Sequence, residues 1–386
     1  MSDGEQEAPG GRGRGRGRRG RRGGDGDGGG GQRYRIPRLI DPCSMRPPPA
    51  KIDTAPMEPE LLWGHGHHRI DAVWANEAGD RPFHIRHTGN LVRYSPLYLP
   101  YLVDAGLSSV LPLAPLTGDP GLITALVERW RPETSTFHMS FGEVTITLED
   151  VATLTGLAID GDAVVVDIPD EDWSGMCLRL LGQAPTDLGG GVIRISWLRE
   201  TFDELPLSAS PQTIEQFARA YALSLMGGVL FSDRSGGSVH LQYLLLVEDW
   251  HRAGRFAWGA AVLSYLYREM GRSPLQMTAS SSLGGDFGGW AALLMIWTWE
   301  RFPHTSPLHA VTGEQITQDA VPRGLRWLPA HTRQHGDQFY LYKLWFDECT
   351  TFVWRPYYHR DVASSRLRAR TVWDETGSAS SSTFRG

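Results

Sequence analysis

Apolar side chains recur every three to four residues through most of the chain, and this helical period constrains the fold more than any other feature. One clear example follows Pro120 and consists of Leu122, Ile123, Leu126, Val127 and Trp130. Asp119 can cap the free amide groups of such a helix, and Pro120 has no amide hydrogen to satisfy at the first helical position. We therefore expect a helix that continues to Trp130.

The same criteria predict helices over 95–107, 173–181, 196–205, 210–231, 240–250, 256–270, 289–302 and 339–349. Ser196 and the pair Ser210-Pro211 are the expected starts of two of them. The segment 289–302 is strongly apolar, so we place it at the centre of the core. The chain has 14 tryptophans, several of them in these segments, and large aromatic side chains favour a well-packed interior.

Between these helices the apolar period changes to two. Phe137, Met139 and Phe141 alternate with polar residues, Gly142-Glu143 can form a turn, and the residues that follow are β-branched. This pattern predicts a small β-hairpin over 137–147. Short peripheral strands are expected at 163–168 and 350–354.

A capping-box sequence, Thr147-Leu-Glu-Asp150, follows the predicted hairpin and indicates a short helix that ends at Gly156. Acidic residues in the first turn are favoured by the helix dipole, so Glu149 and Asp150 are interpreted as capping residues rather than catalytic carboxylates. The expected fold class is therefore mainly α: a multi-helix globular domain with a small hairpin near 137–147.

Composition divides the chain into four parts. Residues 1–31 are a Gly/Arg-rich segment that we expect to be disordered, because it has almost nothing apolar to bury. Residues 32–60 are Pro-rich and read as an extended tether. The helical domain is expected over 61–360, and a flexible Ser-rich tail over 361–386.

The charges are unevenly distributed. Residues 1–38 contain ten arginines and five acidic residues, a net charge of +5, whereas the whole chain carries −6. Arginine donates paired hydrogen bonds to phosphate and stacks on bases, so the arm is a candidate RNA or single-stranded DNA contact. Its candidate residues are Arg12, Arg14, Arg16, Arg18, Arg19, Arg21 and Arg22. A translated GC-rich leader without a binding role is the alternative interpretation.

The sequence disfavours membrane-spanning, secreted and disulfide-rich proteins. No uninterrupted apolar stretch approaches the ~18–20 residues of a membrane span, and the N-terminus lacks the apolar region of a secretory signal. The three cysteines, Cys43, Cys177 and Cys349, are far apart and odd in number, which argues against a disulfide scaffold and suits a reducing compartment.

Three segments carry a family resemblance. Residues 127–161 contain RWRPET, TFHMSFGEVTITLEDVA and a GL-x-x-DG turn; residues 221–270 contain YALSLMGGVLFSDRSGGSVHLQYLLL and AGRFAWGAAVLSYLYREM; residues 294–303 read LMIWTWERFP. Together these signature segments resemble the plant mobile domain of the MAIN (maintenance of meristems) and MAIN-like proteins.

The resemblance implies a nuclear protein that acts in transcriptional regulation, transposable-element silencing and genome integrity. It also implies a protein phosphatase seven-like partner and association with chromatin proteins, since some family members carry such a phosphatase domain and others occur in plant transposable elements. The family has also been labelled aminotransferase-like. A pyridoxal-phosphate enzyme needs a lysine for its Schiff base, and this chain has only Lys51 and Lys343, neither beside a phosphate-binding loop.

We expect no catalytic, cofactor-binding or metal-ligating residues, and the leading hypothesis is a non-enzymatic scaffold. The histidines His65, His67 and His68 lack the partners of a metal site and read as a solvated loop. Two alternatives stay open. One is a nucleic-acid-binding module that uses the arm and a patch of Arg129, Arg131, Arg252 and Arg255. The other is a transposon-derived enzyme in which Asp150, Asp233 and Glu300 converge on a metal.

Overall fold

The computed structural model describes residues 81–85, 91–166, 172–186, 188–235, 237–273, 285–306, 322–330, 339–349 and 352–357. The arm over 1–31, the tether over 32–60, the tail over 361–386 and His65, His67 and His68 all lie outside these ranges. None of the helices in the described ranges is both long enough and apolar enough to cross a membrane.

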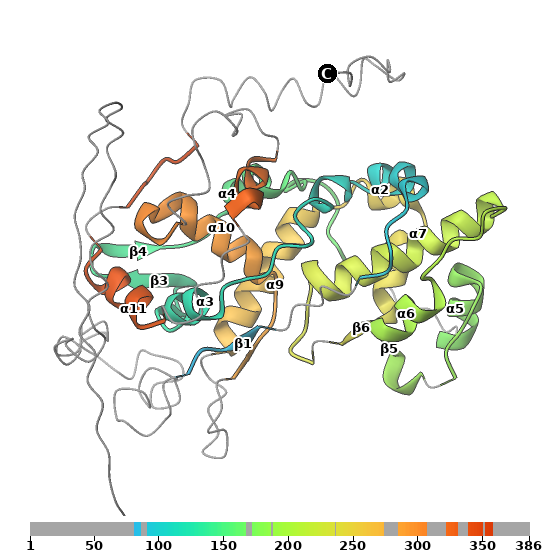
Figure 1. Ribbon diagram of the computed structural model, residues 1–386, viewed down its shortest axis with the longest axis horizontal. Coiled ribbons are helices and arrows are strands. Elements are labelled where there is room, and N and C mark those ends of the chain that lie inside the picture. The colour runs from blue at the N-terminus through green and yellow to red at the C-terminus, as the bar shows by residue number, and fades with distance from the viewer. Residues whose placement is uncertain are drawn as a thin grey trace, which may run out of the picture. The chain divides into compact units, whose positions relative to one another are not determined.

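Helices make up most of this structure (Figure 1). The α-helices are α2 (Leu99–Asp104), α3 (Pro120–Val127), α4 (Leu148–Thr155), α5 (Trp173–Leu181), α6 (Ile195–Thr201), α7 (Pro211–Leu225), α8 (Trp250–Ala253), α9 (Trp258–Arg272), α10 (Ala291–Arg301) and α11 (Phe339–Asp347). Shorter 3₁₀-helices are η3 (Pro96–Tyr98), η4 (Ser108–Val110), η5 (Gly189–Gly191), η7 (Leu241–Val247), η8 (Pro303–Thr305) and η9 (Arg323–Ala330), whereas η6 (Met226–Leu230) is a π-helix.

The strands are short and form three small sheets. They are β1 (His84–Ile85), β2 (Trp130–Arg131), β3 (Thr136–Met139), β4 (Gly142–Val144), β5 (Val192–Arg194), β6 (Ser238–His240) and β7 (Asp286–Phe287). The pair β1–β7 is parallel, whereas β2–β3–β4 and β5–β6 are antiparallel. The mainly α fold class with small sheets is thus confirmed.

Helix α10 lies in the core, as its apolar sequence predicts. Every residue from Ala291 to Glu300 is buried, and Trp297 has no exposed surface. The helix packs against α3 and α4, and α3 is buried at every position after Pro120 (Figure 1). Apolar side chains around the whole circumference of both helices account for this, because a helix without a polar face is stable only when it is enclosed.

Helix α7 begins as predicted, with Ser210 accepting a hydrogen bond from the Thr213 amide at 3.1 Å. It continues through the π-helix η6 rather than as a regular α-helix to residue 231. Gly227 lies in this stretch, and a Cβ there would be 2.4 Å from the Cβ of Val239. Glycine is therefore required for strand β6 to approach the helix so closely.

The first predicted helix ends earlier than expected. Helix α3 stops at Val127, and Trp130 lies in strand β2, where it pairs with Phe137. The predicted hairpin is therefore part of a three-stranded sheet. Its turn was also misplaced: Ser140 and Phe141 form it, whereas Gly142 and Glu143 belong to β4. A continuous apolar spacing cannot distinguish a last helical turn from a buried strand.

Four other sequence predictions differ from the structure. Described residues 163–166 form no strand, and only a single bridge joins Asp162 to Phe256. Helix α6 begins at Ile195, one residue before the expected cap Ser196, because β5 extends to Arg194 and pairs with β6. The segment 240–250 is mostly the 3₁₀-helix η7, and residues 352–354 contain no strand.

Candidate functional site

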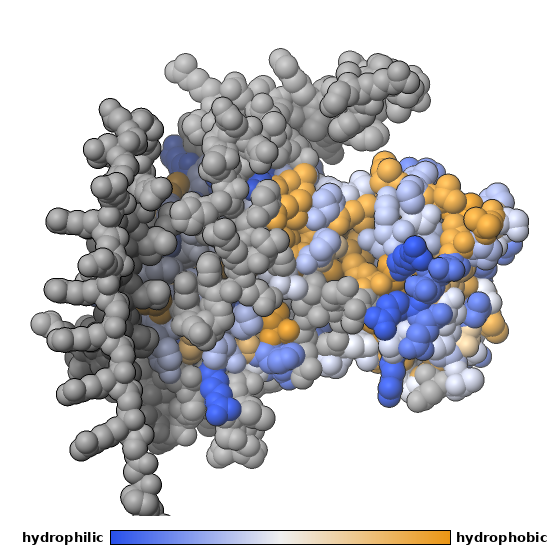
Figure 2. Space-filling model, viewed as in Figure 1, coloured by the Kyte–Doolittle hydropathy of each residue, from blue (hydrophilic) through white to orange (hydrophobic). Residues whose placement is uncertain are grey.

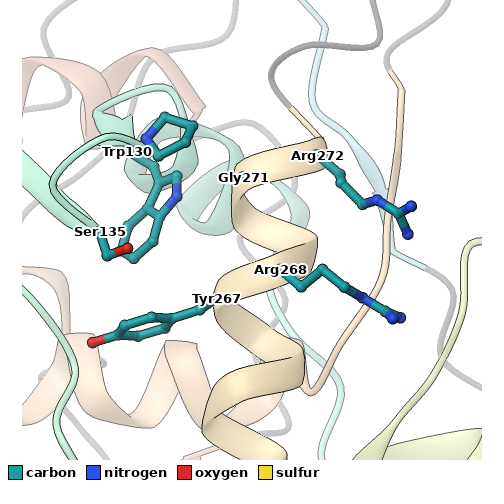
Figure 3. Close-up of a pocket in the computed structure, with 7 residues that line it drawn as sticks. Trp130, Ser135, Tyr267, Arg268, Gly271 and Arg272 are labelled. Carbon is teal, nitrogen blue, oxygen red and sulfur yellow. The ribbon is translucent and has the colours of Figure 1, made fainter. Parts of the chain in front are cut away.

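The structure contains a cavity of about 310 Å³ at the exposed side of α9, next to the β2–β3 connection (Figure 3). We call it the α9 pocket, and it is lined by Trp130, Pro132, Ser135, Tyr267, Arg268, Gly271 and Arg272. Two signature segments of the sequence, 127–161 and 221–270, supply most of these residues. The fold therefore brings two stretches that are distant in the chain to one surface.

The aromatic wall of the pocket is held rigidly. The Trp130 ring makes edge-on contacts with Phe137 and Tyr267, with centroid distances of 4.9 and 5.0 Å. The Tyr267 hydroxyl donates a hydrogen bond to the Ile146 carbonyl at 2.6 Å and lies 2.8 Å from the Thr145 hydroxyl. Burial raises the pKa of Tyr267, so the phenol remains protonated at neutral pH.

Gly271 separates the two sides of the pocket on α9. In Figure 3 the rings of Trp130 and Tyr267 lie to one side of the helix and the side chains of Arg268 and Arg272 extend to the other. A methyl group on Gly271 would lie 3.7 Å from Pro132 Cβ and 3.8 Å from Trp130 Nε1, which is ordinary contact distance. The open space thus depends on the missing side chain and not on a strained backbone.

The basic side of the pocket is organised around one buried carboxylate. Arg268 and Arg272 approach Oε1 of Glu269 at 3.3 and 3.8 Å, and Arg234 approaches its Oε2 at 3.5 Å. The Glu269 side chain is 3% exposed, whereas those of Arg268 and Arg272 are 53% and 55% exposed. Three arginines therefore approach one buried carboxylate, and two of them reach solvent.

A second polar cluster, far more buried, is centred on Asp150. The Asp150 carboxylate accepts hydrogen bonds from the Thr147 amide and hydroxyl, both at 2.8 Å, from Arg301 at 2.6 Å and from the Tyr357 hydroxyl at 2.7 Å. The Thr147 contacts complete the predicted capping box. The cluster thereby joins the start of α4 to the end of α10 and to the segment at Tyr357.

The neighbouring Glu300 has a similar role. Its carboxylate accepts hydrogen bonds from Trp327 at 2.9 Å and from Arg323 at 3.1 Å, and Arg326 lies 3.5 Å away. These contacts attach η9 to α10. Guanidinium groups therefore occupy the surroundings of both Asp150 and Glu300, where a metal ion would need open coordination positions.

The hypothesis of a metal-binding triad finds little geometric support. Asp233, its third member, accepts a hydrogen bond from Ser235 at 2.6 Å in the turn after η6. Among the described residues, no three His, Cys, Asp or Glu side chains are grouped so that they could hold a metal ion.

Lys343 is engaged in an ion pair. Its amino group lies 3.0 Å from Oε2 of Glu128 and 4.4 Å from the centre of the Phe339 ring. The Glu128 side chain is fully buried, and that of Lys343 is 16% exposed. Because the pair joins α11 to the end of α3, Lys343 has a structural role. A lysine that forms a Schiff base instead needs an amino group that is open to the substrate.

The four arginines of the proposed nucleic-acid patch do not form one surface. Arg131 is 4% exposed, and Arg129 pairs with Asp347 with 13% of its side chain exposed. Arg252 lies over the Phe256 ring, and Arg255 pairs with Asp162 beside α8. The arm residues Arg12, Arg14, Arg16, Arg18, Arg19, Arg21 and Arg22 lie outside the described ranges.

The sequence pattern assigned Trp130 to the apolar row of a helix and gave no indication of the α9 pocket. Tyr267, Arg268, Gly271 and Arg272 are spaced i, i+1, i+4 and i+5, which puts them on one face of a helix. A glycine inside a helix is unfavourable unless it has a packing or functional reason. That combination was the available signal, but it does not reveal which other segment completes the pocket.

The mainly helical fold and the three signature segments, 127–161, 221–270 and 294–303, together define a class of protein. A family model described as plant mobile domain matches residues 108–382. The chain belongs to the plant mobile domain family.

Several Arabidopsis thaliana proteins are similar to it. The chain is 35% identical to a serine/threonine-protein phosphatase 7 long form homolog over 79% of its own length, and 35% identical to the protein MAIN-LIKE 2 over 78%. It is 37% identical to the protein MAINTENANCE OF MERISTEMS over 61% of its length. These alignments cover only 23%, 45% and 48% of the respective relatives. No solved structure matches the chain.

Proposed function

We propose that the chain is a non-enzymatic nuclear protein, a protein-interaction scaffold in transcriptional regulation, transposable-element silencing and genome integrity. Membership of the plant mobile domain family supports this proposal, and so does the similarity to a protein named for the maintenance of meristems. The expected partners are a protein phosphatase seven-like protein and chromatin-associated proteins. The phosphatase-named relative is in keeping with the first of these.

The main support for the proposal is that ionisable side chains in the core form ion pairs between helices. Asp150, Glu300 and Lys343, the side chains best suited to chemistry in the signature segments and α11, are engaged in buried ion pairs that join helices. Removing such groups from water is costly and is offset only by well-formed pairs. Their positions therefore serve the framework, which leaves the surface for binding.

That surface includes exposed apolar side chains near α2. Leu97 and Leu99 are 54% and 41% exposed, and Tyr94 beside them is 42% exposed. Figure 2 shows apolar surface gathered over α2. Exposed apolar groups of this kind are typical of protein-binding surfaces when they are contiguous.

Affinity purification of the tagged chain from plant nuclei tests the proposal. We expect a phosphatase seven-like protein and chromatin-associated proteins to be recovered, and a fluorescently tagged chain to accumulate in the nucleus. The tag expressed without the chain is the control for non-specific capture. Exclusion of the chain from nuclei, or recovery of the same proteins by the tag alone, would contradict the proposal.

A second candidate function is nucleic-acid binding through the arm, which its Arg/Gly sequence favours. Binding to single-stranded RNA should weaken steeply as salt rises, because arginines that contact phosphate release counterions. Deletion of residues 10–24 should abolish this binding. Unchanged affinity after the deletion would exclude the arm as the contact.

A further inference from the structure

The α9 pocket has two chemically different sides on one short helical face. Tyr267 and Gly271 lie one turn apart, as do Arg268 and Arg272, so the helix presents an aromatic row beside a basic row. Trp130, Pro132 and Ser135 complete the aromatic side. A ligand that crosses α9 at Gly271 would contact apolar surface first and guanidinium groups next (Figure 3).

Charge specifies what the basic side can bind. Arg234, Arg268 and Arg272 surround the single carboxylate of Glu269, at 3.3 to 3.8 Å. Arg268 also stacks on the Tyr265 ring at 4.4 Å, which fixes the direction of its guanidinium. Asp233 is a second acidic group nearby, since it acts together with Arg268 and Glu269 on the Tyr265 hydroxyl. Two acidic groups against three arginines leave a net positive charge, and Arg268 and Arg272 are more than half exposed, so the exposed part of this cluster attracts an anionic group.

The aromatic side favours an apolar side chain over a nucleobase. Stacking of a base needs an exposed ring face, but Trp130 is 1% exposed and its ring contacts Phe137 and Tyr267 edge-on. The hydroxyl of Tyr267 is already hydrogen-bonded to Ile146. A branched or unbranched aliphatic side chain fits a cavity of about 310 Å³ and needs no hydrogen-bonding partner.

We propose that the α9 pocket binds an acidic peptide segment of a partner protein. One apolar side chain of the segment lies beside Trp130 and Tyr267, and neighbouring Asp or Glu carboxylates contact Arg268 and Arg272. The proposal rests on the scaffold function and specifies the chemistry of a partner. It also explains why α9 has a glycine at 271, where a longer side chain would fill the site.

Synthetic peptides of the form Glu-Asp-X-Asp-Glu, with X as Leu, Met, Phe or Ala, test the proposal against the full chain by fluorescence anisotropy. Burial of a large apolar side chain should make the Leu or Met peptide bind at least about tenfold more tightly than the Ala peptide. The Gln-Asn-Leu-Asn-Gln peptide should bind much more weakly than its acidic counterpart. Binding of all peptides with equal affinity would overturn the proposal.

Variants of the chain separate the two sides of the pocket. Gly271→Met should fill the cavity and remove the preference for Leu over Ala, and Gly271→Ala should reduce it less. Arg272→Gln should weaken binding of the acidic peptide roughly two- to fivefold, the range of an exposed charge pair. Arg255→Gln, which removes a similarly exposed arginine beside α8, is the matched control and should change nothing.

A thermal unfolding curve for each variant shows whether the fold is intact. Gly271→Met has no close contact to disturb at Cβ and replaces a helical glycine, so it should not lower the melting temperature. Undiminished Leu-peptide binding by folded Gly271→Met would overturn the proposal. Tighter binding of a phosphorylated peptide or a single-stranded oligonucleotide than of the Leu peptide is the competing result. If Gly271→Met abolished that tighter binding, the proposal of an acidic peptide ligand would also be overturned.

The outcomes also distinguish this proposal from the scaffold function. If the unaltered chain captures nuclear partners but binds none of the acidic peptides, the pocket proposal fails and the scaffold function stands. If the peptides bind at the pocket but no partner is captured, the scaffold function fails and the pocket stands as a peptide site.

Discussion

At the scale of single residues, buried charges decide much of the stability of this domain. Asp150 has no exposed surface and accepts hydrogen bonds from Thr147, Arg301 and Tyr357. Burial next to this carboxylate raises the pKa of Tyr357, so its hydroxyl remains a donor at any pH the protein meets. A carboxylate so enclosed is tolerable only while its partners are present.

We predict that Asp150→Asn lowers the free energy of unfolding by about 3–5 kcal/mol, because the change leaves the Arg301 guanidinium buried without its counter-charge. Urea unfolding monitored by tryptophan fluorescence measures this loss. Glu149→Gln, at the exposed neighbouring position of α4, is the matched control and should cost less than about 1 kcal/mol. Equal effects of the two changes would contradict the assigned role of Asp150.

His304 makes the stability of the folded domain depend on pH. Burial lowers the pKa of His304, and a hydrogen bond with the Trp345 backbone, which acts in the opposite direction, is the smaller effect. The unfolded chain therefore binds a proton more readily than the folded chain, and the free energy of unfolding should decrease as the pH falls through about 6.5.

Replacement of the His304 imidazole tests the predicted direction of this change in stability with pH. His304→Gln should flatten the stability profile between about pH 7 and pH 5. His240→Gln, at an exposed position of β6, is the control for loss of an imidazole. A profile that is unchanged in His304→Gln, or that rises toward acid pH in the unaltered chain, would contradict the prediction.

At the scale of elements, α11 is held on α3 by charges that lie far apart in the chain. Glu128 pairs with Lys343, and Arg129 pairs with Asp347. Burial beside Asp119 also raises the pKa of Tyr342, whose hydroxyl donates to that carboxylate at 3.0 Å. The contact between α3 and α11 is therefore specified by three separate polar pairs.

We predict that Lys343→Met lowers the free energy of unfolding by about 3 kcal/mol, because the fully buried Glu128 side chain loses this ion-pair partner. Combining it with Glu128→Gln should restore a large part of the loss, since the two residues interact directly. A double-mutant cycle in urea measures the coupling. Strictly additive losses would show that the pair does not stabilise the α3–α11 contact.

The sequence correctly predicted helix ends that are specified by capping interactions between neighbouring residues. The capping box of Thr147 and Asp150 and the end of α4 at Gly156, whose φ is +73°, are found where the sequence placed them. The bounds of α5 agree with the predicted 173–181. The position of Trp130 was not predictable in this way, because its strand pairing with Phe137 competes with helix continuation.

At the scale of the whole molecule, the α9 pocket and the buried ion pairs depend on tertiary contacts. Trp130 contacts Tyr267, and Asp150 contacts Arg301, across more than a hundred residues of chain. Spacing along the sequence carries no information about such pairs, so neither the pocket nor the structural role of Lys343 could be predicted from it. Family resemblance supplied the class of protein, and the geometry supplied the candidate binding surface.

We propose that this domain acts by binding a protein partner, while its buried charges hold the framework together. The decisive experiment is isothermal titration of the purified chain with a purified phosphatase seven-like protein. We expect a saturable complex of defined stoichiometry that is retained in Lys343→Arg, which keeps the ion pair. Absence of heat and of complex formation with the folded chain, at concentrations of tens of micromolar, would contradict it.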